Sequence, residues 1–321
     1  MSMSTETIGK SMTATTSIDY QVFMTDGSSK ISVKGDQSSA DTACQFLEKG
    51  GVIYFPESPF KFSDSDKAFL LAQKQTHADY HKNIAYRPKQ DRVTGFDSPT
   101  KVEAEQLRRI MADFHGQSIR FLQSFLAPYA RNWKIDFASF RPIEEKGRKM
   151  RLRARNDLLH VDSFPTRPIF GDRILRTFIN INPTENRIWR TSETFEKLAE
   201  TFQPTFKVPG DLNKVTPDAP SPLASLKKMF GLKANGKSPY DSWMLDFHNF
   251  LKENNEFQES TRTDMWQFPP NSSWIVFTDM VSHSVLSGKF ALEQTIIVDK
   301  QDLVLPEKAP INILKRIYNR V

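Results

Sequence analysis

Four short runs determine the expected architecture: LLHVD at residues 158–162, RILRTFININ at 173–182, SSWIVFTD at 272–279 and FALEQTIIVD at 290–299. Each run is rich in β-branched or aromatic residues or alternates apolar with polar positions, as strands do. Pro, Asn, Asp and Gly lie between the runs and indicate turns. We therefore expect strands to dominate from about residue 137 onward.

The preceding region is predicted to be mainly helical. ADTACQFLEKGG at 40–51 has the composition of a short helix ended by Gly50 and Gly51, and GVIYFPE at 51–57 that of a strand. From Leu107 to Leu126 apolar residues recur at three- and four-residue intervals, which predicts one long amphipathic helix. Helices followed by short strands favour an α+β fold with a double-stranded β-helix core, of the jelly-roll or cupin-like type, buttressed by helices.

The composition excludes several protein classes. The chain has 321 residues, of which 38% are hydrophobic, and 44 Lys+Arg against 38 Asp+Glu give a net charge of +6. No apolar run approaches the roughly 20 residues that a membrane span requires. The single cysteine, Cys44, cannot form an internal disulfide, and residues 1–17 lack the apolar core of a signal peptide. We therefore expect a cytoplasmic protein.

The domain organisation is predicted to be simple. Residues 1–39 are rich in Ser and Thr and are expected to form a flexible N-terminal tail, in which residues 31–33 are a candidate for one early strand, and residues 40–321 a single domain. Within that domain, residues 208–242 contain several Pro, Gly and Ser residues, a composition that favours a long insertion acting as a lid.

The histidines offer one credible metal pattern. No pair has HExxH spacing, so a zinc protease is not expected. The pattern His-x-Asp with a distant second histidine, which supplies the two-histidine, one-carboxylate triad of non-haem iron oxygenases, occurs at His77–Asp79 and at His160–Asp162. His77 follows a helical-looking segment, in which residues two apart diverge by about 200° around the axis. His160 and Asp162 lie in a strand-like run, whose residues i and i+2 share a face.

The second histidine of this pattern is expected to come from a later strand. His283 lies between two strand-like runs and fits that position. His248 lies in WMLDFHNFL, a helix-like stretch in which a packed or capping histidine is the better interpretation. On the pattern alone, hydrogen-bonded buried polar residues stay open as the alternative to a metal site.

Arg176 adds a second feature to the pattern. It lies in the strand-like run 173–182, where it shares one face with Phe178 and Asn180. An arginine in such apolar surroundings requires a partner, either a structural ion pair or a bound carboxylate. An iron oxygenase that consumes 2-oxoglutarate needs such a cation for the far carboxylate of that cosubstrate.

These residues resemble a known family. HVDSFPTRPIFGDRILRTFININP at 160–183, RIWR at 187–190 and FPPNSSWIVFTDMVSHSVLSGKFALEQT at 268–295 are similar to the Fe(II)/2-oxoglutarate-dependent 3-deoxy-D-manno-oct-2-ulosonic acid (Kdo) hydroxylases. The similarity extends upstream through GVIYFPE at 51–57 and HKNIAYRP at 81–88, so it covers roughly residues 45 to 300.

The resemblance implies a dioxygenase with Fe(II), 2-oxoglutarate and O2 as cofactor and cosubstrates. It implies hydroxylation of carbon 3 of Kdo on a Kdo–lipid A precursor to give Ko, with release of succinate and CO2. The implied catalytic metal ligands are His160, Asp162 and His283. The implied residues around 2-oxoglutarate are Arg176, Trp189 and Arg141. Many members of the wider superfamily carry Arg or Lys about ten residues after the distal histidine, whereas this chain has Glu293 and Gln294 there, so Arg176 is favoured as the carboxylate clamp and Lys289 is the fallback.

The basic residues are concentrated in one stretch. Residues 146–155, KGRKMRLRAR, hold six basic residues and no acidic one, which equals the net charge of the whole chain. From Lys149 onward basic and apolar residues alternate, which predicts a strand with one cationic face, either solvated or binding an anionic glycolipid. No nucleic-acid motif accompanies the stretch. The candidate substrate contacts are Arg151, Arg153, Arg155, Arg167 and Arg87, with Tyr86 and Arg92 as further possibilities.

Two further expectations concern location and rival functions. The basic amphipathic segment 223–233 is predicted to be either a surface helix or a peripheral contact with the cytoplasmic face of the inner membrane. The rivals are a 2-oxoglutarate oxygenase of the same fold with another substrate, and a cupin-like binding protein without catalysis.

Overall fold

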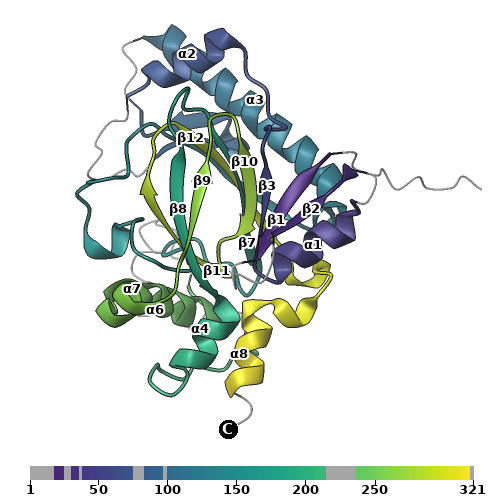
Figure 1. The fold of residues 1–321 in the computed structure, drawn as a ribbon, viewed down its shortest axis with the longest axis vertical. Helices are drawn as coiled ribbons and strands as arrows, with labels where there is room; N and C mark the ends of the chain where they lie inside the picture. The colour runs from purple at the N-terminus through teal and green to yellow at the C-terminus, as the bar shows by residue number, and fades with distance from the viewer. Residues whose placement is uncertain are drawn as a thin grey trace, which may run out of the picture.

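The computed structural model describes residues 18–24, 30–35, 38–74, 83–96, 100–214 and 236–318. Figure 1 shows two antiparallel sheets that face each other, with helices at their ends and on the outer face of the larger one. The mixed helix-and-sheet fold with a jelly-roll core that the sequence predicts is therefore confirmed.

The larger sheet has nine strands in the order β2-β1-β3-β10-β7-β12-β6-β4-β5. All its pairings are antiparallel. Its strands are β1 (Tyr20–Met24), β2 (Lys30–Val33), β3 (Gly51–Phe55), β4 (Ile84–Arg87), β5 (Arg92–Thr94), β6 (Lys134–Arg141), β7 (Arg173–Asn180), β10 (Ser273–Phe277) and β12 (Ala291–Val298).

The smaller sheet has the order β11-β8-β9 and consists of β8 (Arg187–Thr194), β9 (Asp264–Phe268) and β11 (Val281–Ser287). Aromatic residues fill the space between the two sheets. Phe178 on β7 lies 5.0 Å, between ring centroids, from Trp189 on β8, and Trp274 on β10 stacks on Phe268 of β9. Residues from both inner faces thus build one core, as in a sandwich of two sheets.

The outer face of the larger sheet is covered by the long helix that the sequence predicts. The helix α3 (Lys101–Phe125) begins after Thr100, whose side chain accepts a hydrogen bond from Glu103 N. Its buried stripe packs against Ala138 and Phe140 of β6 and Leu292 of β12. Because side chains alternate across a strand, this packing directs Ser139, Arg141 and Glu293 to the inner face. The helix therefore determines which residues of β6 and β12 can reach a site between the sheets.

The remaining helices lie around the ends of the sheets. The predicted helix–strand unit is present as α1 (Ala40–Glu48) leading into β3. Figure 1 shows α4, α6, α7 and α8 grouped at the end opposite α2. Their bounds are α2 (Asp64–Ala72), α4 (Phe195–Phe202), α6 (Pro239–Glu253), α7 (Asn255–Ser260) and α8 (Pro310–Tyr318). Of these, α6 carries His248, as the sequence suggests, and it borders the candidate site described below.

The structure differs from the predicted N-terminal tail. The strands β1 and β2 lie within residues 1–39, and β1 pairs with β3 in the register Val22↔Ile53. Tyr20 and Val22 are buried in the main core. Residues 20–33 look tail-like in the sequence because they are flanked by Ser, Thr and Gly, and only their pairing with β3 gives them a buried face.

The predicted lid at 208–242 is only partly described. Residues 208–214 have no regular structure, and residues 239–242 form the first turn of α6, which begins with a Ser238 capping box. The segment between them, which includes the amphipathic stretch 223–233, lies outside the described residues. Within the part of the chain that the structure describes, no helix is long and apolar enough to cross a membrane.

Candidate active site

The site is built where the sequence motif meets the smaller sheet. His160 forms an isolated bridge with His283 of β11, in which His160 N donates to His283 O at 3.1 Å and His283 N donates to His160 O at 2.9 Å. The run 158–162 is therefore extended but contributes only this bridge instead of the predicted strand. Direct pairing directs both imidazoles to one face, with ring centroids 4.8 Å apart.

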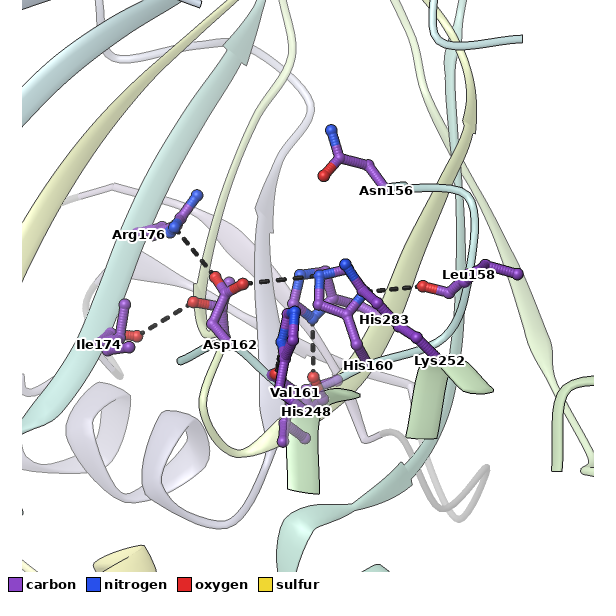
Figure 2. A network of polar contacts seen from close by, with 12 residues as sticks. Asn156, Leu158, His160, Val161, Asp162, Ile174, Arg176, His248, Lys252 and His283 are labelled. Carbon is purple, nitrogen blue, oxygen red and sulfur yellow. Dashed lines mark hydrogen bonds and ion pairs between the residues drawn. The ribbon is translucent and has the colours of Figure 1, made fainter. Parts of the chain in front are cut away.

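Asp162 is positioned by its own backbone bond. Its N–H donates to Thr278 O at 2.8 Å, just after β10. Its Oδ1 lies 3.6 Å from His160 Nε2, so the two side chains of the His-x-Asp motif converge as the sequence predicts. Figure 2 shows Asp162 lying between Arg176 on one side and the imidazoles on the other.

Three histidines have the same hydrogen-bonding arrangement. The Nδ1 atoms of His160, His248 and His283 lie 2.7, 2.7 and 2.9 Å from the carbonyl oxygens of Leu158, Val161 and Val281. A carbonyl oxygen only accepts, so each Nδ1 carries the hydrogen and each Nε2 keeps its lone pair. Histidines that bind a metal through one ring nitrogen commonly donate the other ring N–H to a backbone carbonyl in this way.

The charges at the site suit a cation. Burial lowers the pKa of His160 well below its usual range and also lowers that of His283, so both rings are neutral near pH 7. Burial alone raises the pKa of Asp162, but the charge of Arg176 and the hydrogen bond with His160 outweigh it and hold that pKa well below its usual range. Two neutral nitrogens and one carboxylate form a donor set that a divalent metal prefers.

His248 comes closer to this donor set than the sequence indicates. Among the described residues, one group has ligand atoms that all lie within 4.8 Å of one another, and it consists of His160, Asp162 and His248. The sequence assigns His248 a packing role. Its ring is indeed buried and bonded to Val161 O, but it also lies 4.9 Å from the His160 ring between centroids. Among the described residues this group thus contains His248 and lacks His283, the second histidine that the sequence predicts, although the His283 ring lies 4.8 Å from the His160 ring between centroids.

Of these candidate ligands, His160, Asp162 and His248 line a cavity of about 360 Å³, whereas His283 does not. Its wall includes inward-facing residues of β6, β7 and β12, the His-x-Asp motif and one side of α6. The lining residues used below are Phe137, Arg141, Arg153, His160, Asp162, Phe164, Arg167, Arg176, His248, Lys252 and Glu293.

Glu293 joins two of the predicted arginines at one end of this cavity. Arg176 Nη1 donates to Glu293 Oε1 at 3.1 Å, and Arg141 Nε donates to Glu293 Oε2 at 2.9 Å. The Nη2 of Arg176 lies 3.1 Å from Asp162 Oδ2, an atom that is buried and makes no hydrogen bond. Arg176 therefore has two acidic partners, Glu293 and the candidate metal ligand Asp162.

The chain matches one family model, described as 3-deoxy-D-manno-oct-2-ulosonic acid (Kdo) hydroxylase, over residues 30–321. The chain belongs to the Kdo hydroxylase family. The resemblance inferred from the sequence is therefore confirmed, and with it the class of non-haem Fe(II)/2-oxoglutarate-dependent dioxygenases.

Solved structures of the Kdo hydroxylase KdoO support the same assignment. The apo form is 34% identical, with a TM-score of 0.75, over 87% of this chain and 90% of that chain. The form with alphaketoglutarate and Fe(III) is 33% identical over the same shares, with a TM-score of 0.75. The form with cobalt(II) is 34% identical over the same shares, with a TM-score of 0.76. A search of curated proteins found no match.

Two further buried residues lie on β8 near the site, although neither lines the cavity. Trp189 stacks on the His283 ring at 5.2 Å between centroids, and its Nε1 is buried without a hydrogen-bond partner. Arg187, two residues earlier, was missed by sequence reasoning. It is 1% exposed, and burial lowers its pKa to about 10. The signal for it is the alternation of RIWR, which directs Arg187 and Trp189 to the same face.

The predicted cationic strand at 149–155 is wrong. Residues Leu152–Ala154 form a 3-10 turn, and the residues beside it are irregular. Two of its arginines are held by neighbouring acids instead of forming a stripe, Arg153 by Glu253 and Arg155 by Asp157. Of the predicted substrate contacts in this stretch, Arg153 lines the cavity, whereas Arg151 and Arg155 do not.

The other predicted contacts divide in the same way. Arg167 lines the cavity and lies over the rings of Phe137 and Phe164, at 4.7 and 4.2 Å from their centroids. Arg87 lies 4.4 Å from the same Phe137 ring but does not line the cavity. Further from the cavity, Tyr86 donates to Asp91, and Arg92 is exposed on β5. The fallback Lys289 lies over the Phe290 ring, away from the cavity, and His77 with Asp79 lies outside the described residues.

Proposed function

We propose that this chain hydroxylates carbon 3 of a Kdo residue in a Kdo–lipid A precursor and thereby forms Ko, while 2-oxoglutarate becomes succinate and CO2. The observation that carries this proposal is the pairing of His160 with His283 beside Asp162, next to a cavity that Arg176 and Arg141 also line. Membership of the Kdo hydroxylase family supports the sugar, and the cavity supports an anionic ligand.

The proposed metal ligands are His160, Asp162 and His283. His160 and Asp162 extend from one segment and His283 from the strand paired with it, which gives three ligands on one side and leaves positions free for other molecules. Bound there, Fe(II) supplies the redox chemistry that couples decarboxylation of 2-oxoglutarate to hydroxylation of the sugar. His248 is the alternative third ligand, because its ligand atom lies within 4.8 Å of those of His160 and Asp162.

The proposed site of 2-oxoglutarate is the arginine end of the cavity. A guanidinium pairs both oxygens of a carboxylate, and Arg176 and Arg141 both reach this end. Glu293 occupies their donors and orients them. We expect the bound dicarboxylate to take over some of these donors. Trp189 does not line the cavity and supports the site through its stacking on His283.

The proposed sugar side is the part of the cavity that Phe137, Phe164 and Arg167 line. Phe137 presents an apolar ring held by Arg87 and Arg167, and Phe164 lies beside it. A flat ring flanked by cations suits a sugar that carries negative charge. Arg153 stands at the rim with a side chain that is 65% exposed.

A contact with the cytoplasmic face of the inner membrane would present such a glycolipid to this cavity. Among the described residues, the support is a basic loop near Arg153, in which Lys149 and Arg151 are exposed next to Leu152, which is 45% exposed. A cationic loop with an exposed apolar side chain suits an anionic lipid surface.

The proposed function is tested by substrate-stimulated succinate formation. Purified protein with Fe(II), ascorbate and 2-oxoglutarate should form succinate faster in the presence of a Kdo–lipid A precursor than with the same lipid lacking Kdo. Equal rates of succinate formation with both lipids would support an oxygenase of the same fold that acts on another substrate. No succinate under any condition would contradict a catalytic function.

A further inference from the structure

The hairpin of β4 and β5 places two arginines opposite each other at one edge of the larger sheet. In its register Arg87 lies opposite Arg92, and β5 ends the strand order of that sheet. Directly opposite residues extend from the same face with their Cβ atoms about 4.5–5.5 Å apart, and like charges in that position are destabilising. An anion bound beside this arginine pair would remove that cost.

The acidic residue of the hairpin does not pair with these arginines. Asp91 is the one acidic residue of β4, β5 and the turn between them. Its Oδ1 accepts hydrogen bonds from Tyr86 at 2.8 Å and from Arg108 at 2.7 Å. Tyr86 packs with α3 on the outer face of the sheet, so Asp91 is engaged on that face. Within the part of the chain that the structure describes, the side chains of Arg87 and Arg92 form no ion pair and no hydrogen bond.

Arg87 lies on the inner face of the sheet, beside the cavity. Tyr86 is opposite Ala138 of β6, so Arg87 extends to the same face as Phe137. The guanidinium carbon of Arg87 lies 4.4 Å from the Phe137 ring centroid, and that of Arg167 lies 4.7 Å from the same centroid. Phe137 and Arg167 line the cavity, whereas the arginine pair does not. The pair therefore lies just outside the cavity, beyond the Phe137 ring.

The charges of this corner suit a doubly charged anion. Arg167 is paired with Asp136, whereas Arg87 and Arg92 have no acidic partner among the described residues. Two positive charges are thus uncompensated. A phosphate monoester carries about −1.5 to −2 charges near pH 7, whereas a carboxylate carries a single charge. Guanidinium groups bind phosphate oxygens through paired hydrogen bonds. The chemistry of the arginine pair therefore favours a phosphate group.

The position of the arginine pair fits a part of the glycolipid outside the Kdo residue. The strand β4 lies three strands from β7, which carries Arg176, with β12 and β6 between them. At about 4.7–4.9 Å per strand spacing, this is roughly 14 Å along the sheet. A Kdo residue whose carbon 3 faces the ligands beside Arg176 holds its own carboxylate close to that carbon. The group at the arginine pair therefore belongs to the adjoining lipid A sugars.

We propose that Arg87 and Arg92 bind a phosphate group of the lipid A part and thereby hold the glycolipid while Kdo lies in the cavity. This inference rests on the proposed function. It adds a second subsite outside the cavity and makes the arginine pair a determinant of substrate choice. The protein should therefore prefer a phosphorylated glycolipid to the same glycolipid without phosphate.

The test measures KM for a Kdo–lipid A precursor and for the same glycolipid after removal of its phosphates. Both are dispersed in an uncharged detergent, so that no other lipid supplies phosphate. The KM of the wild-type protein should be about 10- to 100-fold lower for the phosphorylated form, as expected for charge-assisted contacts. In the double variant Arg87→Gln/Arg92→Gln this ratio should fall to about threefold or less, because KM rises for the phosphorylated form alone. Arg87→Lys/Arg92→Lys keeps both charges and should retain most of the ratio.

Arg262→Gln is the matched control, because Arg262 is an exposed arginine that pairs with Asp264 of β9 in the smaller sheet. Its ratio of KM values should equal that of the wild type. Arg92→Gln alone changes an exposed position that does not threaten folding, and it should lower the ratio by about threefold.

A folded double Gln variant with the wild-type ratio would overturn the inference, and so would a wild-type ratio near one. Either result leaves the proposed function standing when both glycolipids are hydroxylated on Kdo. Hydroxylation of neither glycolipid would instead contradict the proposed function. If the double variant bound phosphatidylglycerol vesicles more weakly but kept the wild-type ratio, the arginines would bind the membrane surface and not the substrate, which would also overturn the inference.

Discussion

His160 and His283 are joined by two backbone hydrogen bonds, of 3.1 and 2.9 Å, although 123 positions separate them in the chain. The bridge holds the His-x-Asp segment to β11 and fixes which side chains can meet. Both rings donate through Nδ1 to a backbone carbonyl, so both direct a lone pair into the site. The backbone thus sets the positions of the two rings that we propose as metal ligands.

Removing either paired histidine should abolish tight metal binding. We expect His160→Ala and His283→Ala to weaken Co(II) binding by about 100-fold or more. Losing only the hydrogen-bond partner of a ligand lowers metal affinity by roughly 10- to 100-fold, and losing the ligand itself should cost more. His248→Ala should cost less than about tenfold. Absorption titration with Co(II) measures all three. His115→Ala is the control, because His115 bonds Gln294 away from these ligands. If His248→Ala lost Co(II) binding and His283→Ala kept it, the third ligand would be His248 instead of His283.

Arg176 should determine the affinity for 2-oxoglutarate. Arg176→Lys keeps the charge but loses the paired donors, so KM for 2-oxoglutarate should rise by about 10- to 100-fold. KM for the glycolipid should change far less. Arg108→Lys, on the exposed face of α3, is the control and should match the wild type. If Arg176→Lys kept the wild-type KM for 2-oxoglutarate, another residue would have to bind the far carboxylate of that cosubstrate.

Arg167, on the proposed sugar side of the cavity, should affect KM for the glycolipid, whereas Arg155, outside the cavity, should not. Arg167→Met should raise KM for the glycolipid by about tenfold, as expected from loss of one charge-assisted contact of about 1.5 kcal/mol. Arg155→Met should change it little, because Arg155 pairs with Asp157 and does not line the cavity. Steady-state kinetics with the glycolipid varied separate the two. Equal effects in both variants would favour a diffuse basic surface over a defined subsite.

The buried ion pair between Arg173 and Asp279 should contribute strongly to the free energy of unfolding. Both side chains are 0% exposed, and Arg173 Nε donates to Asp279 Oδ2 at 2.9 Å. Asp279→Asn leaves the arginine uncompensated and should lower the free energy of unfolding by about 3–5 kcal/mol. Asp19→Asn, which breaks an exposed pair with Lys34, should lower it far less, because solvent screens that pair. Urea unfolding compares them, and similar costs for both would contradict this role.

The sequence predicted those parts of the fold that depend on local pattern. The periodicity of residues 107–126 indicated α3, and β-branched runs indicated β7, β10 and β12. The convergence of His160 and Asp162 was predictable for the same reason, because residues i and i+2 of an extended segment share a face. The long motifs around them carried the family resemblance.

The parts that could not be predicted depend on contacts between distant segments. His248 and Lys252 look like residues of an ordinary amphipathic helix, and only the packing of α6 beside His160 brings them to the cavity. The alternation of residues 149–155 suggested a strand, but ion pairs of Arg153 and Arg155 with nearby acids favour a turn instead. The strand β1 was missed because its stability comes from pairing with β3.

The measurement that tests the account most directly is mass spectrometry of a Kdo–lipid A precursor incubated with purified protein, Fe(II), 2-oxoglutarate and ¹⁸O2. The account predicts that the Kdo residue gains one ¹⁸O atom, that fragmentation assigns it to carbon 3, and that product and succinate form in equal amounts. His160→Ala should form neither. Succinate formation without oxygen on Kdo, or oxygen at another carbon, would contradict the account.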